Sequence, residues 1–296
     1  MIEHNDTIDN ANQYIQFDLS FADKWILSRY NSTIEKINEH LNDYKVTEYS
    51  KLIYDFIWRD FCDWYVEILK VQLNLSSDKE YRKKLTQFST WLYENIMKIL
   101  HPIMPFITEE IYHLISERLE NDSISTTAFP TSDKSKIDYD VETQFELVQN
   151  IVEEIRKLRA SINMPSQKLP ATISVPDETT LNIFNNVKPI IINFGKFSEL
   201  NIGINLSKPE GCTSTVYRGI EIHLVIKENI DIDKEKQRLG KEITRLEGNI
   251  RGCESKLNNE KFMAGASPEI IAREREKLTS MQESLKKVKD NLAELI

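Results

Sequence analysis

The sequence predicts a mainly α-helical protein with a small α+β part, and two patterns carry that prediction. Apolar residues recur every three or four positions over long stretches at both ends of the chain, which is the spacing of one helix face. Between these stretches, residues 165–230 hold short β-branched runs separated by turn residues. We expect a leader over residues 1–16, a helical bundle over 17–140, a helix plus a small α+β connector over 141–230, and an antiparallel coiled-coil hairpin, the arm, over 231–296.

Five helices are predicted in the first 162 residues: four form the bundle, and the fifth leads from it to the connector. Ser20 followed by Asp23 is typical of a capping box, and apolar residues at helical spacing then continue to Leu41. Proline ends two of the later helices, because it lacks a donor and restricts the residue before it. The later helices are predicted over residues 47–73, from a Ser77 and Glu80 capping pair to Leu100, over 105–119, and over 141–162.

The connector changes to a strand pattern after Pro165. Arg218-Gly219 separates the last two strands as a hairpin turn. A module of this size has to pack against its neighbours to bury enough surface. Strands are predicted over residues 171–175, 200–204, 213–217 and 221–226, and helices over 178–186 and 188–194.

Two apolar seams predict the arm. The seam positions alternate in steps of three and four, or skip to seven, so each seam follows one side of a helix and needs a partner. A break at residues 265–268 lets the two helices fold back on each other. At about 1.5 Å per residue, the first helix would extend for roughly 43 Å. The seams are Leu239, Ile243, Leu246, Ile250, Cys253 and Leu257, and then Ile271, Leu278, Met281, Leu285, Val288, Leu292 and Leu295.

A basic stripe follows the first arm helix away from its seam. Gly248 and Gly252 lie on the same stripe, and a positive face with gaps lets a phosphate backbone approach closely. The alternative is an ordinary solvated face on which the basic residues alternate with glutamates. The basic residues are Lys234, Arg238, Lys241, Arg245 and Lys256, and the glutamates are Glu235, Glu242, Glu247 and Glu254.

Composition and charge exclude several classes of protein. A formal net charge of −9 argues against indiscriminate nucleic-acid binding, so any RNA would be held by local patches. No apolar run approaches 18 residues and the N-terminal segment is polar and acidic, so neither a membrane span nor a secretory signal is predicted. Cys62, Cys212 and Cys253 are odd in number and far apart, as in reduced thiols of the cytosol.

The sequence lacks the common motifs of catalysis and metal binding. The sequence contains no G-x-x-x-x-G-K loop, H-E-x-x-H, paired C-x-x-C or glycine-flanked serine. The acidic pairs Glu109-Glu110 and Glu153-Glu154 are adjacent residues on predicted helices, so their side chains point apart. We therefore predict no catalytic residue and no metal ligand.

Three motifs in the bundle resemble one enzyme family. Lys24-Trp25-Ile26-Leu27-Ser28-Arg29, the run DFIWRDFCDWYVEILK over residues 55–70 and the run HPIMPFITEEIY over 101–112 occur in this order. Together they resemble the anticodon-binding bundle of class I aminoacyl-tRNA synthetases of the valine, isoleucine and leucine subgroup. IRKLRASINMPSQKL over 155–169 and NNEKFMAGASPEIIAREREKL over 258–278 are similar to the valyl type, the latter to its C-terminal arm. Isoleucyl enzymes commonly end in a cysteine-rich zinc module, which this chain lacks.

The resemblance implies a function for the whole chain. In the family, the parent enzyme activates valine with ATP and Mg²⁺ and transfers it to tRNA(Val), while the bundle reads the anticodon loop and the arm braces the corner where the D and T loops meet. The HIGH-type and KMSKS-type signatures and the editing domain are missing, so we expect a C-terminal fragment with no cofactor of its own. The parent enzyme is expected to be a cytoplasmic monomer. Two alternatives stay open: a coiled-coil scaffold that docks a protein, and the equivalent part of an isoleucyl-type synthetase.

Candidate RNA-binding residues lie in all three parts of the chain. Arg59 sits among apolar neighbours, so it is either exposed to a ligand or paired with Asp55 or Asp63, and family members often carry Asn there. Most rings of the aromatic helix around it are expected in the core. Arg156, Lys157 and Arg159 cluster near the end of the fifth predicted helix, where a favourable interaction with the helix dipole is an alternative reason for their presence. The candidates are Lys24, Arg29, Arg59, Arg156 and Arg159, together with Lys234, Arg238, Lys241, Arg245 and Lys256.

The missing nucleotide-binding signatures generate a first prediction. The purified chain on its own should neither form valyl-adenylate nor charge tRNA, because it carries no motif that holds ATP. The measurement is valine-dependent pyrophosphate exchange, with a complete valine–tRNA ligase as the positive control. Exchange above background would contradict this reading of the sequence.

Overall fold

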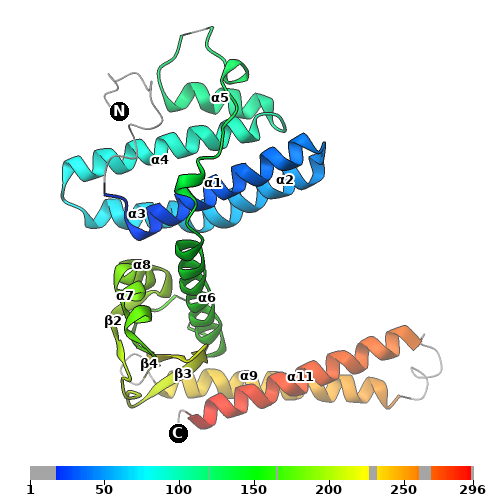
Figure 1. Ribbon diagram of the computed structural model, residues 1–296. Coiled ribbons are helices and arrows are strands. Elements are labelled where there is room, and N and C mark those ends of the chain that lie inside the picture. The colour runs from blue at the N-terminus through cyan, green and yellow to red at the C-terminus, as the bar shows by residue number, and fades with distance from the viewer. Residues whose placement is uncertain (1–17, 120, 165, 227–231, 260–267, 295–296) are drawn as a thin grey trace.

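The computed structural model describes residues 18–119, 121–164, 166–226, 232–259 and 268–294, and the expected leader lies outside them. The fold is mainly α with a small four-stranded sheet, as the sequence predicts. The bundle lies at one end, the arm lies at the other, and a single long helix, α6 (Tyr139–Ser161), runs between them (Figure 1).

The first helix of the bundle begins at the predicted capping box. The Asp23 amide donates to Ser20 Oγ at 3.2 Å, and the Ser20 amide donates to Asp23 Oδ2 at 3.0 Å. Tyr65 Oη donates to the other carboxylate oxygen of Asp23 at 2.8 Å, and Gln72 Nε2 donates to Ser20 Oγ at 2.6 Å. Hydrogen bonds from Tyr65 and Gln72 therefore join the cap to the helical segment over residues 56–75. The bundle elements are α1 (Phe21–Asn42), α2 (Val46–Asp55), η1 (Phe56–Tyr65), α3 (Val66–Leu75), α4 (Lys79–Leu100) and α5 (Pro105–Ile115).

One rod, formed by α2, η1 and α3, replaces the single α-helix predicted over residues 47–73. Its middle part, η1, is a π-helix, in which the Val66 amide donates to the carbonyl of Phe61, five residues earlier. Residues five apart therefore share a face, and Phe56 and Phe61 are both buried. Trp58 lies on the outside and is 57% exposed.

Two helix ends differ from the predictions. Asp78, not Ser77, caps α4, because its Oδ1 accepts the amides of Glu80 at 2.9 Å and of Tyr81 at 3.3 Å. Helix α5 ends at Ile115 instead of residue 119. The carbonyl of Tyr112 accepts Nε of Arg118 at 3.0 Å, and residue 116 is extended, so the helix does not continue. Two 3₁₀ turns follow, η2 (Ile124–Thr126) and η3 (Lys134–Lys136).

Helix α6 docks on the bundle with its N-terminal half. The carboxylate of Glu142 accepts a hydrogen bond from Ser28 Oγ at 2.6 Å and another from Arg29 Nη1 at 3.1 Å. Phe145 stacks on Trp25, with ring centroids 3.9 Å apart. The rest of α6 packs against the connector elements α8 and β3. This helix therefore links the two parts.

The connector sheet has the order β2-β1-β4-β3, in which β1 and β2 are parallel and the other pairs antiparallel. Helices α7 (Glu178–Asn186) and α8 (Lys188–Gly195) make the crossover from β1 to β2. Arg218 and Gly219 both have positive φ, 47° and 80°, as a tight hairpin turn requires. The predicted helices and strands are confirmed, although β2 begins three residues earlier than predicted. The strands are β1 (Leu169–Val175), β2 (Phe197–Ile204), β3 (Cys212–Tyr217) and β4 (Ile220–Val225).

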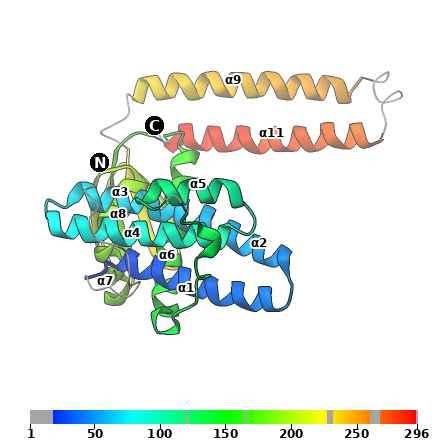
Figure 2. The same cartoon turned by 90° about the horizontal axis from the view of Figure 1, so that it is seen from above.

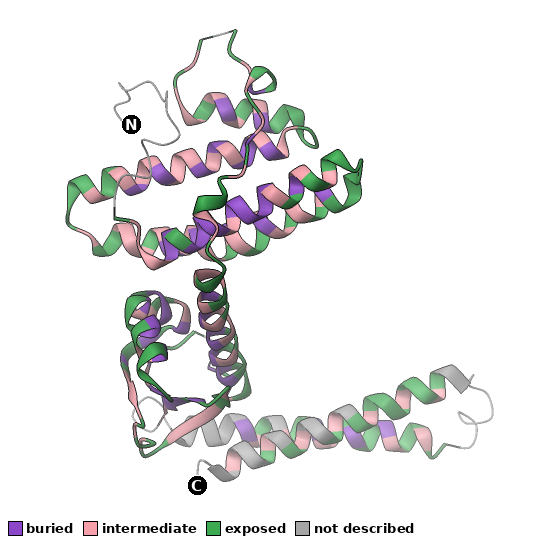
Figure 3. Ribbon diagram, in the orientation of Figure 1, coloured by how far each residue is buried: buried purple, intermediate pink, exposed green. Residues whose placement is uncertain are grey.

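The arm is the predicted antiparallel pair, formed by α9 (Ile232–Leu257) and α11 (Pro268–Glu294), which lie side by side (Figures 1 and 2). Four seam residues of α9 are buried: Leu239, Leu246, Ile250 and Cys253. The described seam residues of α11 are only half-buried. Figure 3 shows the contrast with the bundle, whose helices carry far more buried positions.

The buried carboxylate of Asp23 gives a prediction about stability. Burial raises the pKa of Asp23 despite the hydrogen bonds from Ser20 and Tyr65. Tyr65→Phe removes one of these donors, so the free energy of unfolding should fall by about 1–3 kcal/mol. The measurement is denaturant unfolding followed by circular dichroism.

The matched control for this prediction is Tyr54→Phe, because the Tyr54 side chain belongs to the same rod and is 59% exposed. That variant should stay within about 0.5 kcal/mol of the starting protein. Equal stability of the two variants would show that the Asp23 carboxylate does not depend on Tyr65.

Candidate nucleic-acid interface

The outward face of α9 carries no carboxylate among its described residues. Glu247 and Glu254 are half-buried beside the seam. Lys289 of α11 lies 2.8 Å from Glu247 and lowers the pKa of that carboxyl through a hydrogen bond and its charge. Glu235 and Glu242, on which the alternative of a solvated face of mixed sign also depends, have side chains outside the described residues. The described exposed residues of α9 are Lys241, Thr244, Arg245, Gly248, Asn249, Arg251, Gly252, Ser255 and Lys256.

Glycines interrupt α9 without a packing reason. A Cβ added at Gly240, Gly248 or Gly252 would meet no atom within 4 Å. Each glycine inside a helix costs about 1 kcal/mol relative to alanine. Gly248 and Gly252 lie on the exposed face, where they leave the helix backbone open to close approach.

Only part of the predicted basic stripe falls on described side chains. Lys241 and Arg245 are exposed, whereas the side chains of Lys234 and Arg238 lie outside the described residues. Lys256 is also exposed, and its Nζ lies 3.7 Å from a carboxylate oxygen of Glu274. An exposed ion pair of this length contributes little to stability, so Lys256 stays accessible to a ligand.

Arg59 is exposed on the bundle and also lies near a carboxylate. Its side chain is 76% exposed, and its Nε is 3.3 Å from Asp55 Oδ1. Arg59 is therefore exposed and paired with Asp55 at the same time, and its contact with a ligand stays a prediction. The exposed rings of Tyr54 and Trp58 lie beside it on the same rod, with centroids 6.1 Å apart. Lys24 is exposed on α1.

Arg29 has a structural position inside the bundle. Its Nε donates to Asp60 Oδ2 at 3.0 Å, and its Nη1 donates to Glu142. Burial acts to lower the pKa of Arg29, but the two carboxylates outweigh burial and raise it. The guanidinium thus joins α1, η1 and α6, and its donors are directed at protein carboxylates.

Arg156 and Arg159 have different environments although they are three residues apart. Arg159 is 2% exposed, and its guanidinium donates to the carbonyls of Met164, Gln167 and Lys196 at 2.7–3.0 Å. Burial lowers its pKa. Arg156 is exposed, and its guanidinium carbon lies about 6 Å from the ring centres of Trp64 and Phe194. Arg159 therefore holds the backbone at Met164 and Gln167, whereas Arg156 faces solvent.

Sequence reasoning missed a groove between the bundle and the connector. Its volume is about 1270 Å³, and Arg156 and Arg159 both line it. Three lysines line it as well: Lys168 just before β1, Lys188 at the start of α8, and Lys196 in the turn before β2. Lys188 and Lys196 are far from Arg156 in sequence, and the crossover from β1 to β2 brings them to it.

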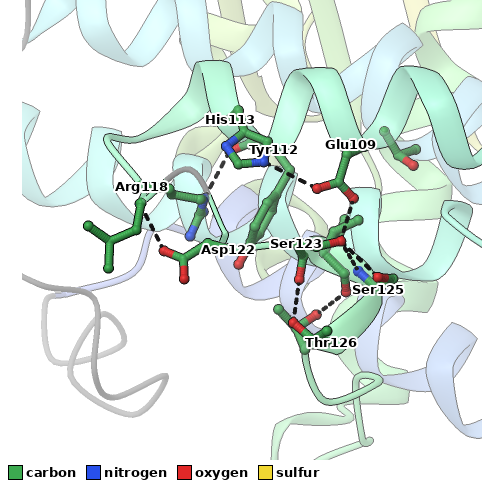
Figure 4. Close-up of polar contacts among 12 residues, drawn as sticks. Glu109, Tyr112, His113, Arg118, Asp122, Ser123, Ser125 and Thr126 are labelled. Carbon is green, nitrogen blue, oxygen red and sulfur yellow. Dashed lines mark hydrogen bonds and ion pairs between the residues drawn. The ribbon is translucent and has the colours of Figure 1, made fainter.

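A Ser, His and Glu cluster beside α5 does not have the geometry of a nucleophile and base (Figure 4). Ser123 Oγ donates to Glu109 Oε2 at 3.0 Å, and the other oxygen of Glu109 lies 3.2 Å from Nε2 of His113. A nucleophilic serine would instead have to donate to the imidazole. The contacts hold the chain that follows α5.

A second pair, Ser214 and His223, does have a serine next to an imidazole, at 2.8 Å. His223 is buried within the sheet, so a substrate cannot reach its ring. Across the residues that the structure describes, no three His, Cys, Asp or Glu side chains come close enough to hold a metal ion. Nor does any described helix combine the length and hydropathy that crossing a bilayer requires.

Two family models match the chain. The model for the anticodon-binding domain of tRNA ligases covers residues 23–175, and the model for the tRNA-binding arm of valyl-tRNA synthetase covers 231–296. Residues 176–230 lie between the two matches.

Curated relatives agree with these matches. A valine–tRNA ligase of Chlorobaculum tepidum is 35% identical over 275 residues, which is 93% of this chain and 30% of that protein. One of Bacillus cereus is 33% identical over 288 residues, with 96% and 32% covered, and one of Geobacter sulfurreducens is 33% identical over 278 residues, with 93% and 31% covered. The chain thus spans about a third of the length of these relatives.

These matches favour the valyl reading over both the isoleucyl and the scaffold alternatives. The first family model covers more than half of the chain, and the second accounts for the arm. The chain therefore belongs to the family of tRNA-ligase anticodon-binding domains and corresponds to the C-terminal portion of valyl-tRNA synthetases.

Proposed function

We propose that this chain is the tRNA-binding portion of a valine–tRNA ligase. The bundle contacts the anticodon loop of tRNA(Val), and the arm contacts the outer corner where the D and T loops meet. The parent enzyme joins valine to this tRNA with ATP and Mg²⁺, which we assign to the part of the relatives that this chain does not span. The free thiols of Cys62, Cys212 and Cys253 suit a reducing compartment, and we expect the protein to act in the cytoplasm.

The outward face of α9 is the observation that carries the proposal. In a chain with a net charge of −9, the described exposed residues of this helix are basic, neutral or glycine. Glu247, a described glutamate of this helix, pairs with Lys289 of the partner helix. A surface built in this way attracts phosphates locally although the whole molecule is acidic.

The separation of the bundle and the arm also supports the proposal. They lie at opposite ends of the molecule with α6 between them (Figure 1). A tRNA likewise presents two distant features, the anticodon loop and the outer corner. A protein that contacts both of these features would recognise the shape of the RNA as well as its charge.

On the bundle, exposed rings and cations could hold unstacked bases. Tyr54 and Trp58 are exposed next to Arg59, and stacking of a base on an aromatic ring contributes about 1–3 kcal/mol. Lys24 is a further exposed cation of the bundle. Arg29 and Arg159 hold protein groups, so within the proposal they position the surface and do not touch RNA.

The proposal predicts a specific loss when the outward face of α9 is neutralised. A variant with Lys241→Gln, Arg245→Gln, Arg251→Gln and Lys256→Gln should keep its helicity, because glutamine is a good helix former. Its affinity for tRNA should fall, and the slope of log affinity against log salt should become shallower by up to roughly 0.9 per phosphate contact removed. We would measure tRNA binding across a salt series.

The matched control removes the same charge from the partner helix, at Arg273, Arg275, Lys277 and Lys286, which are all exposed. If both variants lose the same affinity and slope, charge alone matters and the α9 face is not the contact. If neither differs from the starting protein, the arm does not bind phosphates, and docking of a protein by the arm becomes the better explanation.

A further inference from the structure

Several separate segments line the groove between the bundle and the connector. Asp63, Glu67, Val71 and Asn74 line it from η1 and α3, where they recur at helical spacing. The other lining residues come from α6, from α7 and α8, and from the chain before β1 and at the start of β2. The volume of about 1270 Å³ exceeds the roughly 300–1,000 Å³ of a small-ligand pocket.

Cations outnumber carboxylates in this groove. Five basic residues line it against two acidic ones, although acidic residues exceed basic ones in the chain as a whole. The nearby Lys157, which does not line the groove, lies 3.1 Å and 2.9 Å from Glu153 and Glu154. For the lysines inside the groove, by contrast, the described residues provide no ion pair within 4.0 Å. The basic lining is Arg156, Arg159, Lys168, Lys188 and Lys196.

Six apolar or aromatic residues and four neutral polar residues form the rest of the lining. Trp64 stacks on Phe194, which faces the groove, with centroids 4.6 Å apart and planes 19° from parallel. The guanidinium carbon of Arg156 lies 6.0 Å from the ring centre of Trp64 and 5.8 Å from that of Phe194. An exposed planar cation beside aromatic rings can stack on a nucleobase.

Arg159 supplies a buried donor without an acceptor. Its three other contacts are backbone carbonyls, but its Nε has no hydrogen-bond partner although the residue is 2% exposed. A buried N–H left unpaired is unfavourable. The bond from Arg159 to the carbonyl of Lys196 also fixes the backbone that presents the Lys196 side chain.

We infer that this groove binds a single-stranded segment of RNA, with its phosphates at Lys168, Lys188 and Lys196 and a base against Arg156. The inference rests on the proposed function and extends it to residues 176–230, which neither family match covers. Within that function, the segment is the anticodon loop, because its bases are unpaired and can enter an apolar groove. A duplex keeps its bases stacked inside and would present phosphates only.

The test uses the full chain and two RNA probes. One probe is a hairpin with the anticodon arm of tRNA(Val), and the other is a fully paired duplex of matched length. The groove variant is Lys188→Gln with Lys196→Gln. Its control is Lys157→Gln with Lys208→Gln, which removes the same charge from exposed positions outside the groove. Affinities are measured over a salt series, and thermal melting shows that both variants are folded.

The groove variant should bind the hairpin about tenfold more weakly than the control does, with a salt slope shallower by about 0.7 per phosphate contact removed. Arg156→Lys keeps the charge but loses the planar group. It should weaken hairpin binding several-fold while leaving the salt slope unchanged. Binding of the duplex should differ little among all these variants.

The outcomes separate this inference from the proposed function. If the starting chain binds whole tRNA but the groove variant and its control bind the hairpin equally, the groove is not an RNA site and the proposed function stands. If the groove variant loses hairpin and duplex binding to the same degree, the ligand is not a single strand. If the starting chain binds no tRNA at all, the proposed function itself is wrong.

Discussion

The attachment of α6 to the bundle is the interaction on which the rest of the structure depends. Glu142 receives hydrogen bonds from Ser28 and Arg29, and Arg29 is held in turn by Asp60 on the π-helical segment. Stacking of Trp25 on Phe145 closes the same junction. The connector packs on the other half of α6, so this junction sets where α8 lies relative to α3. The groove depends on that placement.

The basic residues of the chain divide between two tasks. Arg29 and Arg159 point into the protein and use the planar guanidinium to join three elements or three carbonyls. The groove lysines and Lys241 keep their ammonium groups near solvent. The division follows from chemistry, because a guanidinium is more weakly hydrated and offers several donors in a fixed plane. An acidic protein can therefore present basic surfaces to RNA, provided that its carboxylates are paired elsewhere, as Glu247 and Glu153 are.

Much of the fold follows from local sequence signals, and the departures have local causes. The Ser20 cap, the arm seams and the hairpin at Arg218-Gly219 depend on neighbours in sequence, and all were predictable. The π-helical segment was not, because a search at a period of 3.6 residues cannot align Phe56 with Phe61. The early end of α5 depends on Arg118, whose guanidinium reaches back to Tyr112 and to Glu94. Of the candidate residues, Arg59 was foreseen with both of its environments. The burial of Arg159 and the convergence of Lys188 and Lys196 required the path of the chain from β1 to β2.

The single seam of the arm has a consequence for its motions. Each helix buries one stripe against its partner, the described seam residues of α11 stay half-exposed, and three glycines weaken α9 further. Segments with so few buried contacts open locally at a lower free energy than a packed bundle does. Backbone amide hydrogens of α9 and α11 should therefore exchange with solvent through brief local openings. Those of α1 and α4 should exchange only when the whole bundle unfolds. If the arm binds RNA as proposed, part of the binding free energy offsets the opening of its two helices. The complex then dissociates faster than one with a rigid arm would.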